Sequence, residues 1–298
     1  MTTKIVVFLI LILILIILIW YSKTVTFLSK NETKELFDNN YFQHFNKKNI
    51  LARNITKPLR VHYHDNCLDF TKEEINNINQ IIRNLRRLNN HRFFDKWKFG
   101  LVTNKIELGL PHTHYDTIIL SKDLVNDLNI DYGSSLFIHE KTHILQRQYP
   151  DIFEKLYSKW GFIKVNQIKN FDQLKKISRV NPDGLDVKWI FCYKNTYILP
   201  LAIFRGNKLT ECINVGIYLE KDNGNYIVPK NYLKKPLTDC QEYMIFFKNI
   251  NSNNYHPNEL SAEFMSNYWN LGYKVNKFNN KGEIIFSRWC DKYLKKLK

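Results

Sequence analysis

Cysteine is scarce in this sequence, and its spacing does not suggest paired use. The five cysteines are odd in number and far apart, and no C-x-x-C pair occurs. This argues against a disulfide framework and a zinc ribbon, so we expect mainly reduced thiols, although any two of the cysteines could still meet in space. Internal repeats and low-complexity tracts are also missing, which together with the composition excludes a collagen-like chain.

Acidic residues are in the minority. The 298 residues include 44 Lys and Arg against 28 Asp and Glu, a formal net charge of +16. Such a charge permits contact with an anionic partner, but it identifies neither a fold nor a reaction. At this length, with 44% hydrophobic residues, the chain can bury a real core as one large or two modest domains, which excludes a wholly disordered protein.

The N-terminus carries one long apolar run, residues 5–20. As a helix the run would be about 24 Å long, slightly less than the hydrocarbon core of a bilayer, and Trp20 and Tyr21 suit an interfacial end. We therefore expect residues 1–22 to be an uncleaved transmembrane anchor, in contact with lipid through residues 5–21, of a single-pass membrane protein of undetermined orientation. A cleaved signal peptide is the alternative, but no A-x-A-like site follows the run.

The rest of the chain divides into an arm and a folded body. Residues 23–57 are polar and lack clear periodicity, so we expect a stalk or irregular arm, followed by one domain over residues 58–298. Hydrophobic periodicity, capping patterns and turn residues predict the elements of that domain. Helices are expected at 72–90, 133–148, 150–160, 258–271 and 283–297, and strands at 59–64, 98–103, 117–120, 187–193, 196–204, 212–219 and 226–228.

One stretch carries the decisive chemical pattern, His139-Glu140-Lys141-Thr142-His143. It is an H-E-x-x-H sequence within a predicted helix, where the spacing places both imidazoles on one face so that they can bind one Zn²⁺. Glu140 lies about 100° around the helix from His139, next to the metal and outside its ligand set. We therefore predict His139 and His143 as ligands and Glu140 as the general base that takes a proton from metal-activated water. The alternative is an ordinary helix face with an incidental glutamate.

A catalytic zinc site needs a third protein ligand and an open fourth position. The pattern H-E-x-x-H-x-x-G-x-x-H is absent, because Gln146 and Tyr149 occupy its glycine and third-histidine positions, and this excludes the metzincin class. Further along, Asn258 caps a predicted helix on which Glu259 and Glu263 stand one turn apart. One of these carboxylates can bind zinc, while the other accepts the free ring N–H of a ligating histidine.

With these two motifs the sequence resembles the gluzincin-type zinc metallopeptidases. The resemblance implies that Glu259 is the third ligand and Glu263 the orienting residue, with the reverse assignment left open. The chain departs from the thermolysin-like pattern in the long separation of His143 from Glu259 and in ending its second motif with Glu instead of Asp. The anchor, the site and the composition together are similar to uncharacterised membrane-anchored peptidase-like proteins of large DNA viruses.

The resemblance also implies a fold class. We expect an α+β, zincin-like metallopeptidase domain in which a small mixed sheet accompanies the H-E-x-x-H helix and a downstream Glu-bearing helix. A β-rich insertion would separate the two halves of the site. The domain would stand behind one N-terminal transmembrane helix.

We expect a membrane-anchored zinc peptidase that hydrolyses a peptide or protein substrate and uses one Zn²⁺ as its cofactor. The alternative is a catalytically inactive, zinc-stabilised, membrane-tethered binding protein. A third interpretation is a basic anchor that recruits nucleic acid or anionic lipid through Arg83, Arg86, Arg87 and the C-terminal tail at 291–298. A solvated helix face explains these arginines more simply, so nucleic acid is not an expected partner.

Several other residues have a weaker case. Tyr255 and His256 precede the Glu-bearing helix, where they could donate a hydrogen bond to a developing oxyanion or simply pack. Glu154 could be a metal ligand but fits a solvated carboxylate better. Asp183 and Asp186 suit a turn.

Two further features involve strands. The strand at 117–120 is either an ordinary core strand or a sheet edge to which a peptide substrate adds. The triplets His62-Tyr-His64 and His112-Thr-His114 would place two rings on one face of a strand and could hold a second metal, although unrelated histidines are the simpler interpretation.

Overall fold

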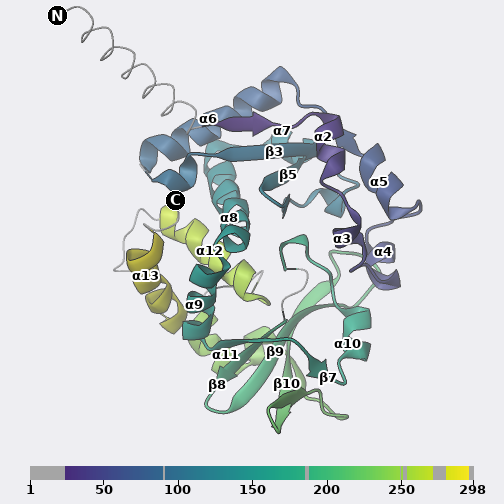
Figure 1. Cartoon of the computed structure of the whole chain (residues 1–298), viewed down its shortest axis with the longest axis vertical. Coiled ribbons are helices and arrows are strands. Elements are labelled where there is room, and N and C mark those ends of the chain that lie inside the picture. Colours follow the sequence, from purple (N-terminus) through teal and green to yellow (C-terminus); the bar gives the residue numbers. More distant parts are fainter. Residues whose placement is uncertain are drawn as a thin grey trace, which may run out of the picture.

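The computed structural model describes residues 24–89, 91–184, 188–248, 250, 254–270 and 280–294. These residues form a mixed α/β fold with two β-sheets. Figure 1 shows one sheet at the top of the molecule and the other at the bottom, with helices α8 (Ile130–Gln148) and α12 (Pro257–Asn270) between them.

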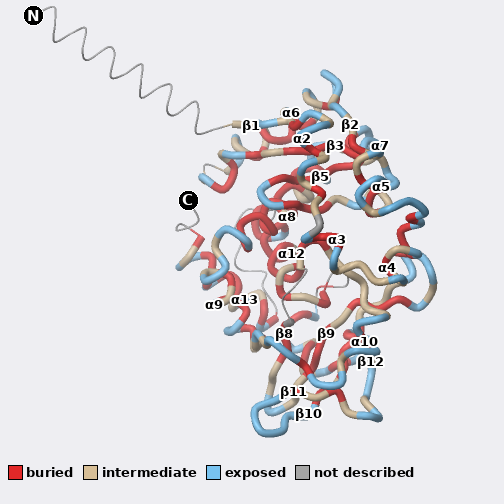
Figure 2. Tube along the Cα trace, turned by 45° about the vertical axis from the view of Figure 1, so that its right-hand side comes forward, coloured by how far each residue is buried: buried red, intermediate tan, exposed pale blue. Residues whose placement is uncertain are grey.

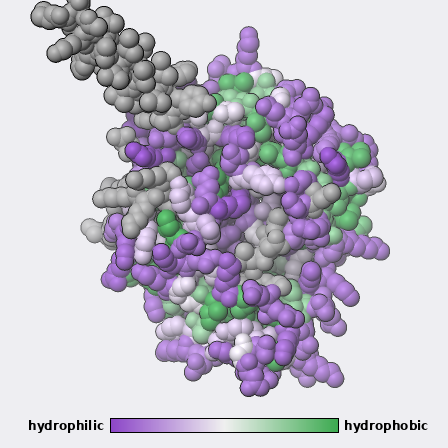
Figure 3. Space-filling view, viewed as in Figure 1, coloured by the Kyte–Doolittle hydropathy of each residue, from purple (hydrophilic) through white to green (hydrophobic). Residues whose placement is uncertain are grey.

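One hydrophobic core joins the two sheets. It contains Leu101 of the first sheet, Phe137 of α8 and Phe191 of the second sheet. Figure 2 shows buried chain in both sheets and in the helices between them. Figure 3 shows hydrophilic residues over most of the viewed face, with smaller hydrophobic areas among them. The sheets and the central helices therefore share their packing.

The first sheet has buried central strands. Its members are β1 (Val25–Phe27), β2 (Cys67–Leu68), β3 (Trp97–Val102), β4 (His112–His114) and β5 (Thr117–Ser121). β3 is parallel to β1 and β5, and β4 runs antiparallel to β5 at the end of the strand order. Every residue of β5 is buried, as expected for a strand covered on both faces. The predicted strand at 117–120 is therefore internal, and β4 lies at the edge.

The second sheet is mainly antiparallel. Its strands are β6 (Phe162–Val165), β7 (Ile168–Lys169), β8 (Lys188–Tyr193), β9 (Thr196–Phe204), β10 (Cys212–Asp222), β11 (Asn225–Ile227) and β12 (Lys234–Pro236). β8 pairs with β9 only as far as Ile198, although β9 continues to Phe204. Near the end of β9, an isolated bridge joins Ser178 to Ile203 instead. This leaves room beside β9 for the segment that follows α10 (Asp172–Ile177).

Helix α8 is buried around much of its circumference. The side chain of Asn129 caps it by accepting a hydrogen bond from the N–H of Tyr132, so the helix begins at Ile130 and not at the predicted Gly133. A Cβ at Gly133 would lie 2.5 Å from Ile81 of α6 (Lys72–Leu88), so the glycine permits close packing of these helices. Helix α9 (Pro150–Trp160) follows, with Gly161 in the left-handed conformation at its end.

Small side chains let α12 approach α8. The Oγ atom of Ser266 on α12 lies 2.6 Å from Oγ of Ser135 on α8 and also donates to the Ser135 carbonyl at 2.8 Å. Ala262, another small residue of α12, is fully buried. Helix α13 (Lys281–Tyr293) packs against α9 and against α11 (Gln241–Phe247). The close contact of α8 with α12 brings the two predicted motifs to the same region.

Two predictions for the N-terminal part of the body are wrong. The predicted stalk at 23–57 contains β1, α2 (Lys30–Glu35), α3 (Asn39–Phe42) and α4 (Lys47–Ala52). β1 pairs with β3, and Phe37 and Tyr41 are buried in a hydrophobic cluster, so this segment belongs to the folded body. The predicted strand at 59–64 is helix α5 (Leu59–Asp65), because tertiary packing decides the state of so short an apolar stretch.

The prediction of a single-pass membrane protein is corrected by the observed helices. In the part of the chain that the structure describes, no helix is long and apolar enough to cross a bilayer. The longest described helix, α8 with 19 residues, carries Asp131, Glu140, Lys141 and Arg147. The segment predicted to span the membrane, residues 1–22, lies outside the described residues. The predicted fold class, a zincin-like domain behind a transmembrane helix, is therefore replaced by a mixed α/β fold with two sheets.

Candidate metal centre

Two histidines lie side by side on α8. His139 and His143 are one turn apart, and their ring centroids are separated by 4.9 Å. The side chain of His143 is 1% exposed, whereas that of His139 is 13% exposed. Both line a cavity of about 410 Å³. His139 is therefore the more accessible of the two histidines.

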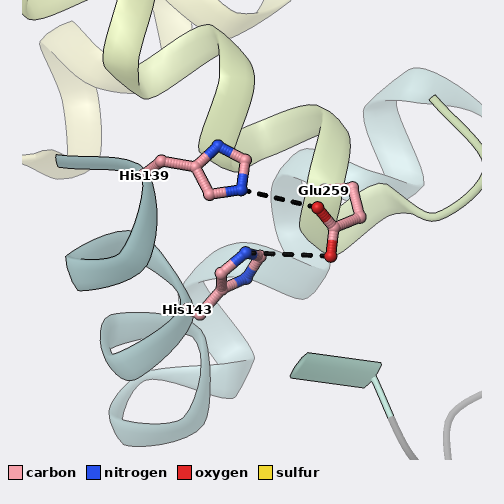
Figure 4. A group of neighbouring side chains, drawn as sticks. All are labelled: His139, His143 and Glu259. Carbon is pink, nitrogen blue, oxygen red and sulfur yellow. Dashed lines mark ion pairs between the residues drawn. The ribbon is translucent and has the colours of Figure 1, made fainter. Parts of the chain in front are cut away.

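Helix α12 brings two carboxylates to these rings. Glu259 lies opposite both histidines: its Oε2 is 3.4 Å from Nε2 of His139, and its Oε1 is 3.8 Å from Nε2 of His143 (Figure 4). Glu263 stands one turn later, with Oε1 3.7 Å from Nδ1 of His139. Glu259 thus faces the Nε2 atoms of both rings, and Glu263 faces the other nitrogen of one ring.

The spacing of these atoms suits a shared metal ion better than direct hydrogen bonds. An N–H···O hydrogen bond is about 2.7–3.2 Å long, so separations of 3.4 and 3.8 Å are too long. Two ligands of a tetrahedral Zn²⁺, with bonds of about 2.0–2.2 Å, lie roughly 3.3–3.6 Å apart, a range that includes the separation of 3.4 Å and lies just below that of 3.8 Å. The potential ligand atoms of His139, His143 and Glu259 are all within 4.8 Å of one another. Two imidazoles and one carboxylate are also a donor set that zinc accepts.

A second group, formed by Glu140, His143 and Asp183, meets the same distance limit of 4.8 Å. It is a poorer candidate because all three residues are buried. In addition, Nη1 of Arg147 lies 3.6 Å from Oδ1 of Asp183 and already supplies a positive charge there. The group that contains the more accessible His139 is therefore the better candidate.

The clustered charges shift the pKa values of the site. Burial opposes the charged form of His139, but Glu259, Glu140 and Glu263 outweigh burial and raise its pKa to about 9. Burial also opposes the charged form of Glu259, but His143 and His139 outweigh it and lower the pKa of Glu259 to about 2. Burial and then the nearby Asp183 raise the pKa of Glu140 well above its usual range. A divalent cation would favour the charged forms of these carboxylates.

Glu140 is buried beside the histidines. It is 3% exposed, and its Oε2 atom has no hydrogen-bond partner among the residues that the structure describes. It lines the same 410 Å³ cavity as His139 and His143. Buried polar atoms are normally paired, so this oxygen is available to a molecule that enters the cavity.

Residues that sequence reasoning missed hold the candidate ligands in position. Nδ1 of His143 lies 3.0 Å from Oε1 of Gln146. The side-chain amide of Asn181 donates to Oε1 of Glu259 at 2.5 Å and to the hydroxyl of Tyr255 at 2.7 Å. Asn181 precedes a 3-10 turn at Pro182–Gly184. The sequence Asn-Pro-Asp-Gly signals such a turn but does not reveal that it lies against α12.

The remaining predicted residues lie in different places. Tyr255 is buried and lines the 410 Å³ cavity. Nδ1 of His256 accepts a hydrogen bond from the N–H of Asn258 at 3.1 Å, and His256 lines a neighbouring, larger cavity. Glu154 forms an ion pair with Lys164. The predicted turn residue Asp186 lies outside the described residues.

The predicted histidine pairs do not form a second metal cluster. His62 and His64 belong to α5, a helix, so they do not share one face of a strand. His112 and His114 lie on β4 with ring centroids 5.3 Å apart. Within the described ranges, none of the four belongs to a group of three or more potential ligands.

Comparisons with known proteins provide no relative from which the chemistry of this site can be transferred. The resemblance to gluzincin-type peptidases therefore stays a prediction that rests on residues of α8 and α12. No protein family matches the chain, and no curated protein or solved structure is detectably similar to it.

Proposed function

We propose that the protein is a zinc-dependent peptidase that hydrolyses peptide bonds with a glutamate as general base. One observation carries the proposal. His139, His143 and Glu259, from two helices far apart in the sequence, converge at 3.4 and 3.8 Å beside the buried carboxylate of Glu140.

His139, His143 and Glu259 would hold one Zn²⁺. Glu263, whose Oε1 is 3.7 Å from Nδ1 of His139, would orient that ring from the side opposite the metal. Zinc with three protein ligands lowers the pKa of water towards about 7 and polarises a carbonyl group. Two histidines from the middle of α8 and one carboxylate from the first turn of α12 would supply these three ligands.

The protein's own groups would move the proton and stabilise the developing charge. Glu140 would take a proton from the attacking water and pass it to the leaving amine, a role that contributes about 10²–10⁴-fold to a rate. The hydroxyl of Tyr255 accepts a hydrogen bond from Asn181. Its own proton can therefore be donated to the oxyanion that forms from the substrate carbonyl.

The variant Glu140→Gln tests the proposal. We expect it to retain about one zinc per chain by metal analysis and to lose at least about 100-fold in kcat/KM toward a library of quenched peptides. In the wild type, 1,10-phenanthroline should abolish hydrolysis and added Zn²⁺ should restore it. Glu154→Gln makes the same chemical change on α9, away from the cavity, and should keep both zinc and activity.

The alternatives have distinct signatures. Wild-type protein without stoichiometric zinc would contradict the metal site itself. Bound zinc without hydrolysis of any peptide, or undiminished hydrolysis by Glu140→Gln, would contradict the peptidase mechanism. Bound zinc without any hydrolysis would instead favour a protein in which zinc only stabilises a binding domain.

A further inference from the structure

A larger cavity adjoins the candidate metal site. Its volume is about 780 Å³, against about 410 Å³ for the cavity at the metal site. This size lies within the range of roughly 300–1,000 Å³ that is usual for ligand pockets. Arg179, Asn181 and Tyr255 line both cavities, so these side chains lie between the two spaces. A peptide bound over the metal site would reach the larger cavity past these three side chains.

The two cavities differ in charge. Carboxylates line the smaller one, namely Glu140, Asp183, Glu259 and Glu263. Cations line the larger one, namely Lys175, Lys176 and Arg179, and its only acidic residue among those described is Asp172. Like charges repel and opposite charges attract, most strongly where water is excluded. A carboxylate on a substrate is thus favoured in the larger cavity.

The backbone on both sides of the Arg179 side chain is held in place. Its N–H donates to the carbonyl of Ala202 on β9 at 2.9 Å. The N–H of Val180 donates to the side-chain oxygen of Asn49 at 2.8 Å, and the carbonyl of Val180 accepts from Nη2 of Arg53 at 2.7 Å. Because the segment is tied to β9 on one side and to α4 on the other, Arg179 is presented from a fixed position.

The same segment connects the larger cavity to the candidate ligands. Asn181, two residues after Arg179, donates to Glu259 at 2.5 Å. Arg179 and Asn181 both line the junction of the cavities. Arg179 therefore borders the space around Glu259 as well as the larger cavity.

Two buried donors at the larger cavity lack an acceptor. Nε of Arg179 and Nε1 of Trp189 have no hydrogen-bond partner among the residues that the structure describes. Both residues line the cavity, and Trp189 is 5% exposed. Buried donors without partners are rare in folded proteins. An anionic acceptor in the cavity would satisfy them.

We propose that the larger cavity selects substrates by a carboxylate, which Arg179 binds while the scissile peptide bond lies at the metal site. This proposal rests on the peptidase function proposed above. The carboxylate comes either from an Asp or Glu side chain or from the C-terminus of the peptide. Both present the planar pair of oxygens that a guanidinium binds with two parallel hydrogen bonds.

The test uses the full-length, zinc-loaded protein and quenched octapeptides in which one position at a time is Glu, Gln or Lys. Each peptide is made with a free and with an amidated C-terminus. If a side chain is selected, Glu exceeds Gln at least about 10-fold in kcat/KM at one position, with Lys lowest, and amidation leaves the preference intact. If the C-terminus is selected, amidation lowers kcat/KM by a similar factor. Either pattern supports the proposal.

Variants connect the preference to Arg179. Arg179→Gln should bring the ratio between carboxylate and neutral peptides to about one, and Arg179→Lys, which keeps the charge without the fork of donors, should give an intermediate ratio. Arg205→Gln is the matched control, because Arg205 is exposed just beyond β9 and lines neither cavity. It should keep the wild-type ratio. Thermal unfolding of each variant verifies that it is folded.

Failure of this proposal differs from failure of the peptidase proposal. Equal hydrolysis of carboxylate and neutral peptides by the wild type, or a preference that Arg179→Gln leaves unchanged, overturns the carboxylate site while peptide hydrolysis still stands. If no peptide is cleaved, fluorescence anisotropy of the labelled peptides measures binding instead. Tighter binding of carboxylate peptides that Arg179→Gln removes supports the site, and equal binding overturns it.

Discussion

Nδ1 of His143 lies 3.0 Å from the side-chain oxygen of Gln146, almost one turn further along α8. The side-chain nitrogen of Gln146 donates to the carbonyl of Asn258 and to Oγ of Ser261 on α12, both at 2.8 Å. These donations fix the orientation of the amide, so the ring donates its Nδ1–H and keeps the lone pair of Nε2 toward Glu259. One side chain thus orients a candidate ligand and links the two helices of the site.

We predict that Gln146→Leu weakens zinc binding by about 10–100-fold, because the ring of His143 loses the acceptor that sets its orientation. Competition with a chromophoric zinc chelator measures the affinity. Ser261→Ala is the control, since it removes a partner of Gln146 on α12 and leaves the contact with His143 intact. Equal losses in both variants would show that helix packing, and not ring orientation, sets the affinity.

Glu259 and Glu263 should differ in their effect on metal content. Glu259 faces Nε2 of both histidines, whereas Glu263 is 3.7 Å from Nδ1 of His139. We therefore expect Glu259→Ala to lose stoichiometric zinc in metal analysis after dialysis. Glu263→Ala should retain zinc with about 10–100-fold lower affinity, because it removes a residue that orients a ligating histidine but not a ligand itself. The reverse result would exchange the roles of the two glutamates.

Local patterns made part of this site predictable. The spacing of His139 and His143 fixes their common face once the segment is a helix, and the structure has that helix at Ile130–Gln148. The same holds for Glu259 and Glu263 on α12. The strands at 98–103 and 196–204 were predictable for a similar reason, because their buried runs and flanking turn residues are continuous in the sequence.

Tertiary contacts between distant segments left the rest unpredictable. Asn181 reaches Glu259 because its segment is tied to β9 and to Arg53, and no local pattern encodes those partners. The three residues of β1 likewise show no periodicity, and only their pairing with β3 makes them a strand. The alternation that suggested a strand at 59–64 gave way to the packing of Tyr63 in a buried cluster. Short elements carry too few residues for a pattern to decide.

The buried ion pair of Arg53 and Glu107 should contribute strongly to stability. Arg53 also donates to the carbonyl of Val180, next to Arg179. Glu107 accepts hydrogen bonds from Tyr41, Tyr63 and Arg53, and neither Glu107 nor Arg53 is more than 2% exposed. Glu107→Gln leaves the charge of Arg53 buried without its counterion, so we expect a loss of about 3–5 kcal/mol in the free energy of unfolding. Urea unfolding followed by circular dichroism measures it. The exposed Glu73→Gln should change stability by less than about 1 kcal/mol.

The contribution of Glu107 should also depend on pH. Burial alone would raise the pKa of Glu107, but Arg53 outweighs burial and lowers the pKa from the usual 4.5 to about 2. Because the pKa is lower in the folded state, the stabilisation is complete above pH 4.5 and is lost as the pH falls from 4.5 toward 2. The stability difference between wild type and Glu107→Gln should therefore shrink from pH 7 to pH 3. A difference that stays constant would contradict the assignment.

Tyr255 should act on the rate and not on metal binding. Its hydroxyl accepts a hydrogen bond from Asn181, which also contacts Glu259, and the ring lines the cavity of the candidate metal site. If this hydroxyl donates to the oxyanion, Tyr255→Phe lowers kcat by about 10²–10³-fold, with little change in KM and with zinc retained. Tyr243→Phe is the control, because Tyr243 is also buried but donates to the carbonyl of Asn254 and lines neither cavity. A similar fall in kcat for both variants would assign the effect to packing, whereas a fall confined to Tyr255→Phe identifies a hydroxyl that acts in the transition state.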